Sequence, residues 1–187
     1  EAMTLFRATA AQQCVAPVRG ASWRKSAAIC HRGLCEGDAA IHCFTPSIMA
    51  FEAAGMMSFR AKARWTLARI LLAQQQYQLA LSMFAELRVE FAELGMANEV
   101  ALVALDVADT LLATGKTSGI ADACREAIVY FEKSHLTASA AAMTAVTHLR
   151  EAALAGEATP TLVSGLRMAF LVETKRTQAT PPAYDFS

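Results

Sequence analysis

The chain has 187 residues, of which 55% are hydrophobic, and its mean hydropathy is +0.30. A disordered polar polymer is therefore excluded, and the length suits one domain or about four helical repeats. Seventeen Lys and Arg residues balance seventeen Asp and Glu residues, so net charge does not attract the molecule to nucleic acid or anionic lipid. Alanine is abundant and there are only nine glycines and five prolines, which favours an all-α fold.

Further features of the sequence indicate a cytoplasmic protein. No stretch without Asp, Glu, Lys or Arg is longer than the one from Ser134 to Leu149, which is shorter than the roughly twenty apolar residues of a membrane-spanning helix. Five cysteines at irregular spacing suit a reducing compartment better than a set of disulfides. The chain begins at Glu1 without an initiator methionine or a secretory signal pattern, so we expect a fragment of a longer protein.

Residues 1–54 predict an irregular N-terminal segment with a degenerate first repeat. Residues 1–13 have the spacing of a short lead helix, and a helical hairpin is predicted over 23–35 and 38–54. Pro46 lies inside the second helix of this hairpin. Because a proline inside a helix removes a backbone hydrogen bond and costs about 3 kcal/mol, we expect a break near Phe44.

Residues 55–176 predict regular helical hairpins. Apolar residues recur at helical spacing in segments that begin at Ser58, Tyr77, Asn98, Ser118 and Leu136. Gly95 has the position of a left-handed C-cap, and Asn98 and Ser118 have the positions of N-caps. Each predicted helix is joined to the next by a short turn.

A final helix is predicted to cap the array. Thr159 and Pro160 form a typical helix start, with the capping residue first and proline in the first turn. The apolar pattern then continues to Arg176. Residues 177–187 are expected to form a C-terminal tail.

A forty-residue repeat runs through the chain. Phe51, Phe91 and Phe131 keep this spacing without an insertion. The same spacing relates three further sets of positions: Ala28, Ala68 and Ala108; Ala40, Ala80 and Ile120; Phe44, Phe84 and Cys124. A period near forty residues is typical of a helical-hairpin solenoid, in which each hairpin buries its apolar face by stacking on its neighbours.

The best-formed hairpin resembles a known repeat family. Between Arg64 and Leu87 the small and aromatic residues stand in the order of a tetratricopeptide repeat: Leu67, Ala68, Leu71, Tyr77, Ala80 and Phe84. The resemblance extends over Ser58 to Ser134 and implies a superhelix like that of tetratricopeptide repeat proteins. HEAT-type repeats share the period, but the set of Tyr77, Ala80 and Phe84 favours the tetratricopeptide family over them.

The length of the repeat also indicates a class of protein. Forty residues is longer than the usual thirty-four of this family. It resembles the extended repeats of bacterial regulatory and signalling proteins, whose repeats often follow a regulatory or DNA-binding head. The resemblance therefore implies the C-terminal repeat region of such a protein.

The resemblance further implies a binding groove along the first helix of each hairpin. By register, the groove residues are Lys62, Trp65, Arg69, Leu72, Leu102, Leu105 and Asp109. A peptide would use Trp65 as an anchor and Arg69 as the partner of an acidic group. The alternative interpretation is that Trp65 packs half-buried between repeats while Lys62 and Arg69 form a solvated rim.

The sequence predicts neither catalytic residues nor a cofactor. Gly115, Lys116 and Thr117 resemble the end of a phosphate-binding loop, but Thr110 stands where that loop needs its first glycine. Cys124 lies on an apolar stripe, where burial disfavours a reactive thiolate. Five residues of metal-ligand type gather early in the chain without a familiar zinc spacing: Cys30, His31, Cys35, His42 and Cys43. We expect no metal site there.

The hypothesis from sequence is a non-enzymatic scaffold that binds a protein or peptide in the concave groove. Nucleic acid is disfavoured as a partner, and a membrane is excluded by the hydropathy argument. The alternative is a ligand-responsive or nucleic-acid-responsive transcriptional or signalling regulator, with Lys25, Arg32, Lys62 and Arg69 as its contacts.

Overall fold

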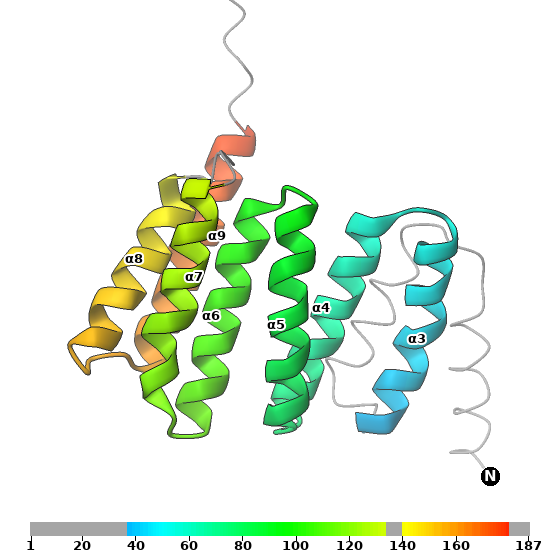
Figure 1. Cartoon of the computed structure of the whole chain (residues 1–187), viewed down its shortest axis with the longest axis horizontal. Coiled ribbons are helices and arrows are strands. Elements are labelled where there is room, and N and C mark those ends of the chain that lie inside the picture. Colours follow the sequence, from blue (N-terminus) through cyan, green and yellow to red (C-terminus); the bar gives the residue numbers. More distant parts are fainter. Residues whose placement is uncertain (1–36, 134–139, 180–187) are drawn as a thin grey trace, which may run out of the picture. The chain divides into compact units, whose positions relative to one another are not determined.

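The structure is a computed structural model that describes residues 37–133 and 140–179, with side chains over 44–132 and 140–174 (Figure 1). These residues form α-helices, one short 3-10 helix and turns, and no strand occurs among them, as expected for an all-α protein. The elements are α3 Gly37–Ala53, α4 Met57–Ala73, α5 Tyr77–Glu93, α6 Ala97–Ala113, η1 Thr117–Gly119, α7 Ile120–Lys133, α8 Ala140–Leu154 and α9 Pro160–Ala179. The predicted helices over 1–13 and 23–35 lie outside the described residues.

Helix boundaries recur at a constant interval. Helices α3, α4, α5 and α6 each have 17 residues and begin at residues 37, 57, 77 and 97, so each hairpin advances the chain by forty residues. Phe51, Phe91 and Phe131 each stand third from the end of their helix and are 3%, 0% and 4% exposed. The forty-residue spacing therefore corresponds to equivalent buried positions in α3, α5 and α7.

The turns between these helices share one conformation. The middle residue of each turn has a positive φ: 67° at Gly55, 63° at Gln75, 71° at Gly95 and 70° at Gly115. The predicted left-handed conformation of Gly95 is confirmed. At the end of α6 the N–H of Lys116 donates to the carbonyl of Leu111 at 2.9 Å, and the N–H of Gly115 donates to the carbonyl of Leu112 at 3.1 Å. These two bonds define a Schellman motif, which uses the carbonyls that a helix leaves unpaired at its C-terminus.

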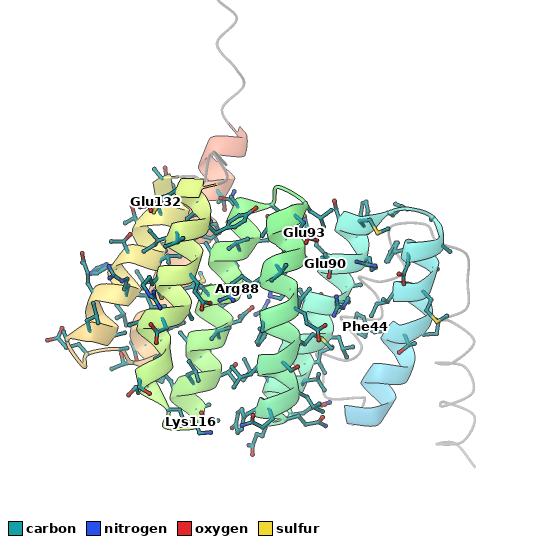
Figure 2. The ribbon with its side chains drawn as sticks, viewed as in Figure 1. Phe44, Arg88, Glu90, Glu93, Lys116 and Glu132 are labelled. Atoms are coloured by element: carbon teal, nitrogen blue, oxygen red, sulfur yellow. The ribbon has the colours of Figure 1, made fainter. Side chains whose placement is uncertain are left out.

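The chain divides into two compact units, which we call unit 1, ending at Leu94, and unit 2, starting at Gly95. In unit 1, α4 packs against both α3 and α5. The core is aromatic and aliphatic, and its largest fully buried side chains are Phe44, Phe84, Phe91, Leu71 and Leu87. Figure 2 labels Phe44 on α3, where the side chain is completely buried.

In unit 2, α6 packs against three other helices, α7, α8 and α9. The fully buried side chains of unit 2 include Val100, Val103, Leu105, Ile120, Leu149 and Val163. The predicted last helix is present. Its start is as expected, because the N–H of Leu162 donates to Thr159 Oγ1 at 3.2 Å and the helix begins at Pro160. It continues to Ala179, three residues beyond the predicted end.

Helix α3 is continuous, so the predicted break near Phe44 is wrong. Pro46 is exposed and lies inside the helix. Phe44 and Phe51 are seven residues apart, on one face of the helix, and both are buried. An unbroken helix is the arrangement that buries both rings, and their burial offsets the one backbone hydrogen bond that the proline removes.

Two predicted N-caps are also corrected. Helix α6 begins at Ala97 with Met96 as the capping residue and without a side-chain cap, so Asn98 lies within the first turn. Ser118 lies inside the 3-10 turn that precedes α7. The three-residue turn accounts for both differences, because the chain re-enters helical conformation two residues after the residue with positive φ, at Ala97 after Gly95 and at Thr117 of η1 after Gly115.

Candidate functional site

Four of the residues predicted to line a groove share one face of α4. Lys62, Trp65, Arg69 and Leu72 are separated by three, four and three residues, which is the spacing of a single helical face. Arg69 is exposed, and the other three side chains are half-buried. We call these four residues the α4 face.

Trp65 is fixed on the α4 face by contacts on two sides. Its ring meets Phe91 of α5 edge to face, with centroids 5.8 Å apart and planes at 85°. The guanidinium of Arg69 lies 5.9 Å from the centroid of the Trp65 ring. This is cation–π geometry, in which the positive group is attracted to the electron-rich face of the indole. The half-buried indole thus packs on the second helix of its own hairpin and has a guanidinium over its ring.

An ion-pair network joins α4 to the helices on both sides of it. Glu90 of α5, labelled in Figure 2, accepts from Arg60 Nη2 at 2.8 Å and from Arg64 Nη1 at 2.5 Å. Arg60 also donates to Glu52 of α3 at 3.1 Å, and Arg64 also donates to Glu86 of α5. The network orients α4 and therefore the residues on its α4 face.

Burial gives this network its strength. The Glu90 side chain is only 10% exposed, whereas Glu52 and Glu86 are 57% and 62% exposed. The hydrogen bond to Glu90 raises the pKa of Arg60 above its ordinary value, against the lowering effect of burial. Helical spacing is the one signal of this network in the sequence, because Arg60 and Arg64 stand four residues apart on α4, as Glu86 and Glu90 do on α5; it does not predict which helices pair.

The three predicted groove residues of α6 have a different environment. Leu105 is completely buried, Leu102 is half-buried, and Asp109 is 32% exposed at its side chain. Leu105 is therefore a core residue of unit 2 in this structure, and no ligand reaches it. The cause is that α6 is covered by three helices, whereas the sequence pattern shows only the apolar face and not what packs on it.

Asp109 is engaged by the last helix. Arg167 of α9 donates to Asp109 Oδ2 at 2.6 Å and to Asp106 Oδ1 at 2.7 Å. The Asp106 side chain is 2% exposed and that of Arg167 is 15% exposed. Burial by itself lowers the pKa of Arg167, but the two carboxylates together raise it above its ordinary value, so the guanidinium stays charged. A single guanidinium of α9 thus bridges two acidic side chains of α6.

Two positions singled out in the sequence for possible chemistry have structural roles. Burial raises the pKa of Cys124 to about 12, so its thiol stays protonated near neutral pH and is a poor nucleophile. Gly115 and Lys116 form the turn after α6 and no strand leads into them, so they are the predicted helix end and not a phosphate-binding loop.

No group of three or more His, Cys, Asp or Glu side chains suited to a metal ion occurs among the described residues. The early cluster of cysteines and histidines, Cys30 to Cys43, falls outside the described side chains. Within the described ranges, no helix has the length and apolar character needed to cross a membrane.

Comparison with known proteins gives no match: no protein-family model, no curated protein and no solved structure matches the chain.

Proposed function

We propose that this chain is a non-enzymatic helical-repeat scaffold, similar to tetratricopeptide repeat proteins, that binds a protein or peptide partner. The observation that carries the proposal is the α4 face, where Trp65 is held edge-on against Phe91 and Arg69 lies over its ring. A fixed aromatic ring beside an exposed guanidinium is the combination found at energetic centres of protein interfaces. An acidic or apolar side chain of a partner finds a complementary group there.

The repeated architecture supports the same proposal. Helices α3 to α6 have 17 residues each and are joined by three-residue turns, which is the local geometry from which hairpin solenoids are built. In the proposed superhelix the α4 face belongs to the concave surface, and the chain forms the C-terminal regulatory part of a larger bacterial protein in the cytoplasm. The five cysteines suit that reducing compartment.

A peptide-display selection tests the α4 face directly. Peptides are selected on the wild-type chain and then measured by fluorescence anisotropy on the Trp65→Ala, Arg69→Glu double variant. We expect the selected peptides to lose about tenfold or more in affinity, because the anchor is removed and the charge is inverted. Arg125→Glu is the control, since Arg125 is 58% exposed on α7 and pairs only locally with Asp122. Equal affinity for the wild type and the double variant would exclude the α4 face as the binding surface.

The alternative function, a regulator that binds nucleic acid or a charged small ligand, is favoured by the positive charge of Lys62 and Arg69 on the same face. Salt dependence separates the two proposals. Phosphate contacts release counterions, so nucleic-acid affinity falls steeply with salt concentration, whereas burial of a peptide on Trp65 depends on salt only weakly. A steep salt slope that becomes shallower in Arg69→Glu would favour the alternative.

A further inference from the structure

Helix α9 shows how unit 2 holds an amphipathic helix. The inward residues of α9 recur at helical spacing, with Val163 and Phe170 buried at 0% and 3% exposure and Arg167 between them. The opposite face is exposed at Met168, Leu171 and Val172. The charged end of Arg167 lies on Asp106 and Asp109 of α6. A guanidinium flanked by two buried apolar side chains is thus the inward pattern of a helix that packs on α6 and α8 and is paired with α6 through its charge.

The position of Asp109 on α6 is equivalent to that of Arg69 on α4. Both helices have 17 residues and begin forty residues apart, so Asp109 and Arg69 each occupy the thirteenth position of their helix. Leu105 in the same way corresponds to Trp65. The charge at the equivalent position is therefore inverted between the two units.

We infer that the α4 face binds an amphipathic helix of a partner protein that carries a carboxylate where α9 carries Arg167. The partner helix would present an acidic residue to Arg69, with apolar residues four positions before it and three positions after it, as Val163 and Phe170 flank Arg167. Lys62, one turn before Trp65, adds positive charge on the same face. This inference rests on the proposed function and names its partner: an acidic amphipathic helix rather than an extended peptide.

The chain itself supplies the test probe. The probe is a synthetic peptide of residues 160–174 with Arg167→Glu, and its matched control is the same peptide with the native Arg167. Both are locked as helices by a side-chain crosslink between positions 168 and 172, which are exposed in α9, and helicity is checked by circular dichroism. Binding to the full chain is measured by fluorescence anisotropy.

We expect the acidic helix to bind the wild-type chain about tenfold more tightly than the native-sequence helix, because the charge pair changes from repulsive to attractive. In the Arg69→Glu variant this preference should reverse, and in Arg125→Glu it should be unchanged. A reversal of preference depends on charge at position 69 and would not follow from a general loss of folding.

Two results would overturn the inference. One is equal binding of the two helices to the wild-type chain, and the other is a preference that Arg69→Glu leaves unchanged, as would occur if the probe displaced α9 from α6. Either result leaves the proposed function standing if display-selected peptides still depend on Trp65 and Arg69. Loss of that dependence as well would refute the proposed function.

Discussion

Glu90 is the residue on which the geometry of unit 1 depends most. It is the most buried acidic side chain of the network and accepts from both Arg60 and Arg64. The guanidiniums of Arg60 and Arg64 are only 24% and 23% exposed, and both pair with this carboxylate. Their second partners, Glu52 and Glu86, are exposed, and ion pairs with exposed carboxylates stabilise a fold only weakly. Removal of a buried partner costs more than removal of an exposed one, because the remaining charges lose a partner that water replaces incompletely.

We therefore expect Glu90→Ala to destabilise unit 1 by about 2 kcal/mol. Urea unfolding followed by circular dichroism measures the change. The matched control is Asp122→Ala, which removes a carboxylate that is 67% exposed and paired with exposed Arg125, and it should change stability by less than about 0.5 kcal/mol. Similar losses of stability in the two variants would show that burial of Glu90 adds nothing to the stabilising effect of its ion pairs.

Cys124 gives the fold a pH dependence at alkaline pH. Burial raises the pKa of Cys124 from 9.0 to about 12. In the unfolded chain the thiol loses its proton near pH 9 while the folded chain keeps it, so rising pH favours the unfolded state. The stability that the folded state gains from keeping the Cys124 thiol protonated is therefore fully present below pH 9 and is lost as the pH rises toward 12.

Between pH 8 and pH 10 this residue should reduce the free energy of unfolding by about 1 kcal/mol. The measurement is urea unfolding of the wild type and of Cys124→Ala at both pH values. The variant should be less stable at pH 8, because it leaves a cavity, but its stability should fall less on going to pH 10. An equal fall in both proteins would contradict the burial of the thiol.

At the scale of single elements, the turns carry the regularity of the fold. Four turns have a residue with φ between 63° and 71° in the middle position, and three of these residues are glycines. The exception is Gln75, between α4 and α5. A residue with a Cβ atom is sterically strained in this conformation, whereas glycine is not, so the backbone of Gln75 is strained in its turn.

We predict opposite effects for two substitutions in equivalent turns. Gly115→Ala should destabilise the chain by about 1 kcal/mol, and Gln75→Gly should stabilise it by roughly 0.5 kcal/mol. Thermal unfolding of both variants measures the effects. A methyl group added at Gly115 meets no atom within 4 Å, so the expected loss comes from backbone conformation alone and not from a clash. Changes of the same sign in both variants would disprove the explanation.

At the scale of the whole molecule, each unit has its own core and its own buried charge network. In unit 1 the network joins α4 to α3 and α5, and in unit 2 Arg167 joins α9 to α6. Substitutions in the two networks should therefore loosen different parts of the chain.

Hydrogen exchange measured by mass spectrometry tests this separation. Glu90→Ala should speed exchange mainly in residues 37–94, and Arg167→Ala should speed it mainly in residues 95–133 and 140–179. Each variant acts as the control for the other. Equal acceleration of both parts by either variant would mean that the chain opens as a single cooperative body.

The sequence by itself determined the helices, their forty-residue register and the left-handed turn at Gly95. These features depend on interactions within a few residues, namely the helical spacing of apolar side chains and the conformational freedom of glycine. It also placed Lys62, Trp65, Arg69 and Leu72 on one face, because helical periodicity alone fixes that. The predicted break near Phe44 is wrong because burial of Phe44 and Phe51 in the core outweighs the local preference of Pro46.

Only the tertiary structure decided what becomes of equivalent positions. Leu105 and Trp65 share a register, yet Leu105 is core and Trp65 is half-buried, because three helices pack on α6. The pairing of Arg60 with Glu90 spans 30 residues and that of Arg167 with Asp106 spans 61. Such pairs depend on how helices pack, and local sequence patterns carry no information about that.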